Sequence, residues 1–414
     1  MRSSIAACKT PQNHPRVHLL DVRIRLRAGD FRYWQNYAPG VQAGYCPPAR
    51  KRPCTACTPL VKILVDIGHP AHVHFFRHPI RLLQQHGHTV LVTSRDKEIA
   101  LQLLDELGIH HIPISRQGRG GTLSLAREFV RREYQLYKIV KRYKPSLLTG
   151  IGGIFVAHIG RLLGLPSLVF YDTENATAQN ALTYPFASRV VVPRCYQGWV
   201  PRRRHRRYDG YHELSYLHPD YFRPNRAVAE KNGLLAGHRN FLVRTVSWQA
   251  SHDIGEHGWS AALLERIVST LSKAGKVMVS AEGSLPRDLA PYAYPGDITK
   301  LHHVMAFCSG FIGESATMAS ECAVLGVPAV LAARVGRGYT DEQEARYGLL
   351  RNVRDVSWRA LYPNLQWLLE VSAETIRSAR QKLLDESIDV AAFVAQSIEQ
   401  FPKLPNGSHQ PSVD

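Results

Sequence analysis

The chain has 414 residues, of which 44% are hydrophobic and 21% are charged, and this length allows two or three domains that each bury a core. No uncharged apolar run reaches the roughly 18 residues of a membrane span, so the composition excludes an integral membrane helix. The formal net charge is +18, and ten Arg or Lys against two Asp make the first sixty residues strongly basic. This imbalance separates a leader from the rest of the chain.

The leader, residues 1–60, has no regular hydrophobic pattern. Because Val61 can be encoded by an alternative start codon, we expect the leader to be disordered or a start-site artefact. Four of the seven cysteines lie in it, and Cys54-x-x-Cys57 lacks the second pair that a zinc site needs, so we expect no metal site. The three scattered cysteines of the remainder indicate reduced thiols and a cytoplasmic location.

Beyond the leader, short β-branched runs alternate with amphipathic helical patterns, which is typical of βαβ units around a parallel sheet. The first series predicts strands at 62–67, 89–94, 111–115, 146–151, 167–172 and 189–193, and a long basic helix at 122–143. A stretch rich in Tyr, Pro and His interrupts the pattern at 208–238. The second series predicts strands at 241–247, 276–283, 310–315 and 328–334, and helices at 258–274, 299–308, 317–325, 341–349, 359–371 and 374–400.

The two series predict two domains of similar α/β architecture. We expect a Rossmann-like acceptor domain at 61–225, a Rossmann-like nucleotide-binding domain at 226–385, a closing helix at 386–401 and a disordered tail at 402–414. Ligands of such domains bind outside the carboxyl ends of the strands, so the strand-to-helix loops should carry the chemistry. We therefore expect two parallel sheets that face a central cleft.

Three histidines follow the first strand in the motif DIGHPAHVHFF. Pro70 suits a first helical position, so His69 should lie near the N-cap. His72 and His74 then fall in the first turn, where an imidazole can act as a general base or donate to an anion. Exposed polar residues at a helix start would give the same pattern. We choose His72 as the base because it lies off the apolar face that carries Val73.

Two further loops of the first series are candidates for an acceptor site. In GIGGIFVAH, Gly152 and Gly153 open a helix and let a ligand approach the backbone, although tight strand-to-helix packing explains them equally well. In YDTENA, Asp172, Glu174 and Asn175 follow an apolar strand and could bind sugar hydroxyls. Such residues are also ordinary caps and turns, so both explanations stay open.

The second series contains a polar loop, SWQASHD, directly after its first strand. Backbone N–H groups and hydroxyls in such a loop suit a diphosphate, and a long polar turn is the alternative. The candidate residues are Ser247, Trp248, Gln249 and His252.

A second candidate nucleotide loop is GESATMASECAVLGVP. Ser315, Ala316 and Thr317 lie where a strand passes into a helix, and a helix start favours a phosphate. Glu321 lies one turn inside that helix, where its carboxylate could accept hydrogen bonds from a ribose diol. A surface carboxylate is the alternative, but Glu321 is flanked by apolar residues.

Two basic features accompany the first series, the helix at 122–143 and the stretch PRRRHRRYDG at 201–210. Such patches bind phosphate-bearing acceptors, anionic membranes or nucleic acid, and a solvated face is the commoner explanation. Neither a stacked-aromatic RNA motif nor a DNA-reading helix is present in the sequence, so we do not expect a nucleic-acid partner. We expect peripheral contact with the cytoplasmic face of an anionic membrane.

Together, six ordered motifs resemble the domain of unknown function 354 family, which is placed with the glycosyltransferase-B fold. They lie between Val61 and Leu350 and read KILVDIGHPAHVHFFR, SRDKE, YDTENA, GYHELSYLHPDYF, SWQASHDIG and GESATMASECAVLGVPA. The resemblance implies a glycosyltransferase-B-like fold of two Rossmann-like domains.

Within that fold, the last motif is similar to the nucleotide-binding segment of the UDP-N-acetylglucosamine 2-epimerases. Ser315 matches the Ser of that segment and Glu321 its ribose-binding Glu, whereas Ala316 and Thr317 replace two glycines and Ser320 replaces the first Glu of a pair.

The first half is similar to the lipid-linked N-acetylglucosaminyltransferase of cell-wall synthesis. The likeness implies that the first histidine loop, the glycine turn and the YDTENA loop form the acceptor side. The Gly-rich character of the first loop is missing in this chain, so an acceptor diphosphate would be held differently or be absent.

These observations lead us to expect a metal-independent glycosyltransferase that moves a sugar from a nucleoside diphosphate, UDP-linked, to a hydroxyl acceptor that could be lipid-linked. No cofactor beyond the donor substrate is expected. One alternative is a UDP-N-acetylglucosamine 2-epimerase-like epimerase or hydrolase of sugar nucleotides. The other is a non-catalytic binding protein that is recruited by its basic patches.

Overall fold

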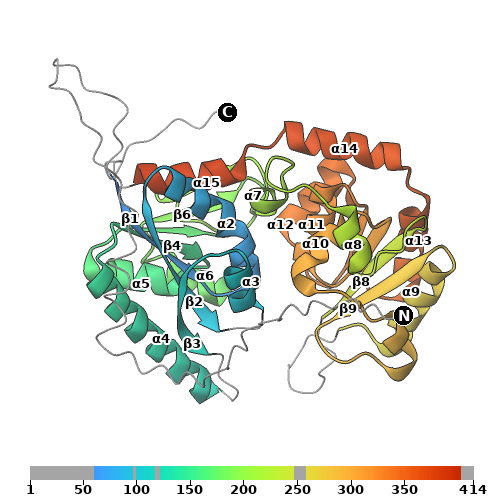
Figure 1. The fold of residues 1–414 in the computed structure, drawn as a ribbon, viewed down its shortest axis with the longest axis horizontal. Helices are drawn as coiled ribbons and strands as arrows, with labels where there is room; N and C mark the ends of the chain where they lie inside the picture. Colours follow the sequence, from blue (N-terminus) through green and yellow to red (C-terminus); the bar gives the residue numbers. More distant parts are fainter. Residues whose placement is uncertain (1–59, 97–98, 117–121, 247–257, 402–414) are drawn as a thin grey trace, which may run out of the picture. The chain divides into compact units, whose positions relative to one another are not determined.

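A computed structural model describes residues 60–96, 99–116, 122–246 and 258–401 (Figure 1). The predictions for the leader, for the tail and for the loop that contains Ser247 to His252 therefore lie outside the described residues. All statements below concern the described part of the chain.

A seven-stranded parallel sheet forms the first half, in the order β3-β2-β1-β4-β5-β6-β7. Its strands are β1 (Lys62–Ile67), β2 (Thr89–Asp96), β3 (His111–Arg116), β4 (Leu147–Ile151), β5 (Ser167–Phe170), β6 (Arg189–Pro193) and β7 (His205–Tyr208). The strand order reverses direction between β1 and β4, and a crevice opens at the carboxyl ends of the strands at such a point.

The helices of the first half connect consecutive strands of this sheet (Figure 1). They are α2 (Pro70–Gln85), α3 (Ala100–Glu106), α4 (Thr122–Tyr143), α5 (Ile154–Leu163) and α6 (Thr177–Thr183). In α2, Pro70 takes the first helical position, and the Nδ1 atom of the N-cap His69 accepts a hydrogen bond from the Ala71 N–H at 3.2 Å. Val73, Phe76, Ile80 and Leu83 of α2 are buried, which confirms the predicted core face.

A five-stranded parallel sheet forms the second half, in the order β12-β11-β10-β8-β9. Its strands are β8 (Asn240–Thr245), β9 (Lys276–Ala281), β10 (Gly310–Gly313), β11 (Ala329–Ala332) and β12 (Leu350–Val353). Its helices are α9 (Ala261–Ser272), the 3-10 turns η1 (Arg287–Tyr292) and η2 (Ile298–Lys300), α10 (Leu301–Met305), α11 (Ala316–Leu325), α12 (Gly338–Glu342) with the π-helical turn η3 (Gln343–Tyr347), and α13 (Trp358–Glu370). The predicted fold class, two parallel α/β sheets, is confirmed.

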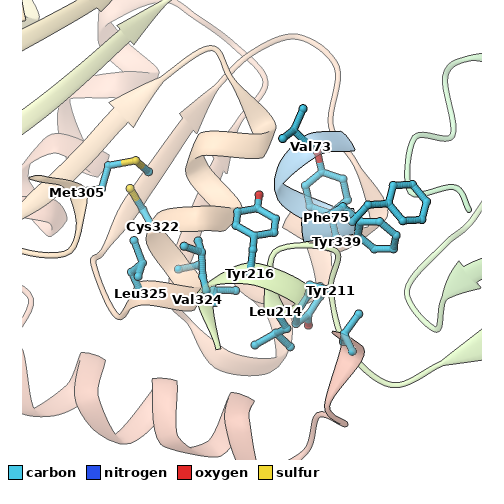
Figure 2. Close-up of a cluster of buried hydrophobic side chains, with 14 of the residues drawn as sticks. Val73, Phe75, Tyr211, Leu214, Tyr216, Met305, Cys322, Val324, Leu325 and Tyr339 are labelled. Carbon is cyan, nitrogen blue, oxygen red and sulfur yellow. The ribbon is translucent and has the colours of Figure 1, made fainter. Parts of the chain in front are cut away.

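The segment between the sheets contains α7 (Leu214–Leu217) and α8 (Arg226–Lys231), and it contributes to a core that both halves share. Figure 2 shows part of this core, in which Val73 and Phe75 of α2, Tyr216 of α7 and Val324 of α11 lie in one cluster. Two further cores fill the outer faces of the first and second sheets. The strands that carry the loops at their carboxyl ends are thus fixed by well-packed cores.

The structure differs from the sequence-based prediction most clearly at two strands and two helices. The helix predicted at 341–349 is α12 followed by the π-helical turn η3. The strands β7 and β12 were not predicted, because β7 (HRRY) lies in an Arg-rich run and β12 (LRNV) has Arg and Asn between its two apolar residues. The helix predicted at 374–400 is two helices, α14 (Ala373–Asp385) and α15 (Val390–Gln400). The break arises because Asp389 caps α15, its Oδ1 accepting from the Ala392 N–H at 2.9 Å.

The closing helix α15 packs on α2 of the first half and on α7. Its Glu399 pairs with His86 at 2.6 Å and with His88 at 3.2 Å, near the end of α2. In the described chain, no helix combines the length and the apolar character that crossing a bilayer requires.

Candidate functional site

A cavity of about 200 Å³ lies where β4, β5 and the start of α2 meet the segment around α7 and the start of α11. Its lining residues are His69, Ala71, His72, Phe75, Ile151, Asp172, Thr173, His212, Glu213, Tyr216 and Thr317. The cavity therefore unites three of the predicted loops, and it adds a segment, HELSY at 212–216, that was not predicted as a site. We call it the central cavity.

His72 lines the central cavity in a fixed tautomer. The Gly68 N–H donates to its Nδ1 at 3.2 Å, so the proton of the neutral ring is on Nε2. Burial first, and then the nearby His69, lowers the pKa of His72 to about 3. The ring is consequently neutral at physiological pH and suits the role of a hydrogen-bond donor better than that of a proton acceptor.

The other two histidines of the first loop have different surroundings. His69 is exposed at the N-cap and lines the cavity, with its ring centroid 6.0 Å from that of His72. His74 does not line it and instead contacts Tyr216 at 5.3 Å and His302 at 4.8 Å between ring centroids. Burial, and then His302, holds the pKa of His74 well below its usual value.

Asp172 and His212 are paired in the central cavity, with 3.1 Å between Oδ2 and Nδ1. Thr173 donates to the other carboxylate oxygen of Asp172 at 2.9 Å. Burial alone would raise the pKa of Asp172, but the charge and hydrogen bond of His212 outweigh it and lower this pKa to about 2.

The ring of His212 is oriented as in other Asp-His pairs. Its Nδ1 faces the Asp172 carboxylate, which leaves the lone pair of the neutral ring on Nε2. That Nε2 atom is buried and has no hydrogen-bond partner among the described residues. Phe75 packs against the ring, with 4.4 Å between the centroids, and fixes its plane. The arrangement gives the cavity an oriented imidazole that can accept a proton.

Glu213 adds a second carboxyl group to the same cavity, and it is only 2% exposed. Burial first, and then the negative charge of Asp172, raises the pKa of Glu213 to about 8. At neutral pH the cavity therefore contains an ionised Asp172 and a protonated Glu213. Two carboxyl groups whose pKa values are driven apart in this way are typical of acid and base partners.

Glu321 lies one turn inside α11, as predicted, and it is buried. Its Oε1 accepts a hydrogen bond from the Tyr216 hydroxyl at 2.8 Å and lies 2.9 Å from His302 Nε2. Glu321 does not line the central cavity, because the ring of Tyr216 does so instead. A ribose diol that used Oε1 would have to compete with the Tyr216 hydroxyl for this atom.

Ser315 is the N-cap of α11, which begins one residue before the helix predicted at 317–325. The Ser315 hydroxyl accepts a hydrogen bond from the Met318 N–H at 3.3 Å, and Ala316 is the first helical residue. Of the three residues predicted here, only Thr317 lines the central cavity.

The glycines predicted for an acceptor site lie in a packed turn. Both adopt left-handed backbone angles, with φ of 69° at Gly152 and 36° at Gly153. The Gly152 carbonyl accepts from the Thr183 hydroxyl at 3.0 Å, and a Cβ atom at Gly153 would collide with Val169. Neither glycine lines the central cavity, and a glycine is favoured at both positions by the left-handed backbone and, at Gly153, also by close packing.

Glu174 and Asn175 line a different cavity, of about 170 Å³, beside Arg337. Glu174 Oε1 accepts hydrogen bonds from the Gln197 and Gly338 N–H groups, each at 3.2 Å. Burial raises the pKa of Glu174. The YDTENA loop is therefore divided between two cavities, and only Asp172 of the three predicted residues reaches the central one.

Glu314 was not predicted, although it links Val246 to Trp259 through two hydrogen bonds. Its Oε2 accepts from the Val246 N–H and its Oε1 from the Trp259 N–H, each at 3.0 Å. Burial raises the pKa of Glu314 to about 7. His212, Glu213 and Tyr216 were also missed, and the only sequence signal for them was the motif GYHELSYLHPDYF.

These two parallel sheets, with a cavity at the carboxyl ends of their strands, define a glycosyltransferase-B-like fold. The chain belongs to the family described as "Protein of unknown function (DUF354)", which matches residues 61–337. It is 26% identical over 131 residues to the uncharacterized protein MJ0665 of Methanocaldococcus jannaschii, a match that covers 32% of this chain and 38% of that protein.

Solved structures resemble the whole fold. The UDP-GlcNAc 2-epimerase of Neisseria meningitidis, bound to UDP-GlcNAc, is 13% identical with a TM-score of 0.57, and the match covers 83% of this chain and 100% of that one. MurG of Acinetobacter baumannii is 17% identical with a TM-score of 0.51, and the match covers 83% and 100% of the two chains. At these identities the likeness is one of fold.

Proposed function

We propose that the protein is a glycosyltransferase that moves a sugar from a nucleoside diphosphate, UDP-linked, to a hydroxyl acceptor. The observation that carries this proposal is the central cavity, which brings the start of α11 together with the Asp172–His212 pair. Support also comes from the fold, because one protein of similar fold is bound to UDP-GlcNAc. The start of α11 would receive the diphosphate, since its free N–H groups and helix dipole favour an anion.

His212 takes the role of general base in this proposal, in place of the first-loop histidines. Asp172 orients its ring, and Nε2 would remove the proton from the acceptor hydroxyl as that oxygen attacks the anomeric carbon. His72 would donate its Nε2 hydrogen to the departing diphosphate or to a sugar oxygen. Glu321 would bind the ribose after the Tyr216 hydroxyl moves away.

The test begins with thermal unfolding of the full chain in the presence and absence of UDP. A ligand that binds the folded state raises the melting temperature, and we expect this shift to be lost in Glu321→Gln. His212→Asn should retain the shift but lose sugar transfer, because it changes the base and not the nucleotide contacts. Absence of a shift with every nucleoside diphosphate would refute the nucleotide-sugar proposal.

A sugar-nucleotide epimerase or hydrolase is the second candidate, and one observation favours it. Asp172 and Glu213 place an ionised and a protonated carboxyl in the same cavity, as acid-base chemistry on a bound sugar requires. Incubation with UDP-GlcNAc and no acceptor separates the candidates. Rapid consumption that is lost in Glu213→Gln would support the second candidate, and consumption only with an added acceptor would support the first.

A further inference from the structure

The outward face of α4 is basic and apolar. Among the described side chains of this helix, the large exposed apolar residues are Val130, at 66%, and Tyr134, at 59%. Arg127, Arg131 and Lys138 are exposed at helical spacing on either side of them, so all five residues lie along one stripe. A 22-residue helix is roughly 33 Å long, which makes the stripe a long surface feature.

The acidic residues of α4 do not neutralise this stripe. Glu128 pairs with Arg95 at 2.7 Å, and Glu133 pairs with His158 at 2.5 Å, so both carboxylates face neighbouring elements. Every residue of α4 that is exposed between positions 126 and 143 is therefore a cation, an alanine or one of the two large apolar residues. A solvated helix face normally mixes both signs of charge.

Neighbouring elements also expose large apolar residues. Six of the ten large hydrophobic residues that are exposed in the described chain lie between positions 130 and 199. Beyond α4 they are Leu162, Leu182, Phe186 and Trp199. α4 contacts α5, and α5 contacts α6 (Figure 1). His158 of α5 lies 2.8 Å from the Leu182 carbonyl and packs against Phe186 with 4.8 Å between ring centroids.

The aromatic residues extend this surface toward the Arg-rich stretch. Trp199 is 70% exposed and contacts Tyr184, with 5.8 Å between ring centroids. Arg202 and Arg203 follow it and are exposed. Arg204 donates to the Ala187 carbonyl at 2.8 Å and so ties this stretch to the end of α6. The concentration of exposed apolar residues exceeds what single scattered residues would give.

We infer that the exposed surfaces of α4, α5, α6 and the stretch 199–203, together the α4 face, dock on an anionic lipid bilayer. Trp, Tyr, Leu and Phe side chains prefer the boundary between headgroups and acyl chains, while Arg and Lys pair with anionic headgroups. A protein partner of this chemistry would need an acidic and apolar surface. A nucleic acid would use the cations but not Val130 or Leu162. The inference is independent of the proposed transferase activity, because it concerns lipid binding alone.

Co-sedimentation of the full chain with vesicles tests this inference. The vesicles are equal parts of phosphatidylcholine and phosphatidylglycerol, or phosphatidylcholine alone. We expect binding only to the anionic vesicles, and we expect added salt to weaken it. The double variant Arg127→Gln/Arg131→Gln should bind about 25-fold more weakly, because each cation near such a surface contributes roughly a five-fold factor.

A second variant and a matched control complete the experiment. Val130→Ser/Tyr134→Ser retains the cations and should also bind more weakly, because it removes the inserted apolar groups. Arg359→Gln/Tyr362→Ser makes the same types of change on exposed positions of α13 and should bind as the wild type does. Since all variants retain the basic leader, its contribution is constant.

Two outcomes would overturn the inference. Wild-type binding by both α4 variants would place membrane binding elsewhere in the chain. Equal or tighter binding of duplex RNA or DNA, lost in the same arginine variant, would assign the α4 face to nucleic acid instead. Melting temperatures of the variants that match the wild type would exclude misfolding as the cause of weaker binding.

Discussion

The protonated carboxyl of Glu213 leads to a quantitative prediction about stability. In the folded chain the pKa of this group is raised from 4.5 to about 8, first by burial and then by Asp172. Between these two pH values the folded chain holds a proton that the unfolded chain has released, so stability falls as the pH rises from 4.5 toward 8. At pH 7, which is about 2.5 pH units above 4.5, the folded state has lost roughly 3 kcal/mol of stability, at about 1.4 kcal/mol per unit.

Glu213→Gln removes this dependence because the amide has no proton to release. The difference in free energy of unfolding between variant and wild type should therefore increase, in favour of the variant, by about 3 kcal/mol from pH 4.5 to pH 7. Any constant effect of the amide on packing or hydrogen bonding cancels in this comparison. Urea unfolding of both proteins across this pH range measures it.

The matched control is Glu265→Gln, the same substitution at an exposed position of α9. Its difference from the wild type should stay constant with pH. A constant difference for Glu213→Gln as well would show that Glu213 ionises freely in the folded protein. The proposal of an epimerase or hydrolase would then lack the protonated carboxyl group on which it depends.

Three further predictions concern the stability of the fold and the binding of UDP. Asp172→Asn should lower the free energy of unfolding by about 2 kcal/mol at pH 7 and not at all near pH 2, because the folded pKa of about 2 lies below the ordinary 3.8 and the stabilisation is lost as the pH falls through this interval. Urea unfolding measures this difference, and equal losses at both pH values would contradict the prediction. Gly153→Ala should destabilise the fold by about 2 kcal/mol, because the backbone of Gly153 is left-handed and an added Cβ would collide with a neighbouring side chain. Gly348 is also left-handed but has open space around it, so Gly348→Ala should destabilise about half as much. Equal melting temperatures of the two variants would refute the packing argument. Tyr216→Phe should tighten UDP binding about five-fold in calorimetry, because the hydroxyl no longer competes for the carboxylate; weaker binding would mean that Tyr216 itself holds the nucleotide.

Local sequence pattern was sufficient for most of the secondary structure. The helix predicted at 122–143 has these bounds in α4, and the strand predicted at 62–67 is β1. The cap at His69 was also predicted, because a cap depends on residues within one helical turn. Strand β12 was missed because its sequence, LRNV, has Arg and Asn between two apolar residues, whereas the equally short β11 is apolar throughout.

The sequence also determined which loops would be polar, since parallel α/β units carry their polar residues at the carboxyl ends of strands. It did not determine which polar residues meet. Asp172 and His212 are forty positions apart, and they pair because the segment around α7 packs against α2. The same packing turns His74 toward His302 and covers Glu321 with Tyr216. Backbone hydrogen bonds and hydrophobic periodicity are set by residues that are close in the sequence. These contacts depend instead on how distant elements fill a shared core, and so only the tertiary structure decided them.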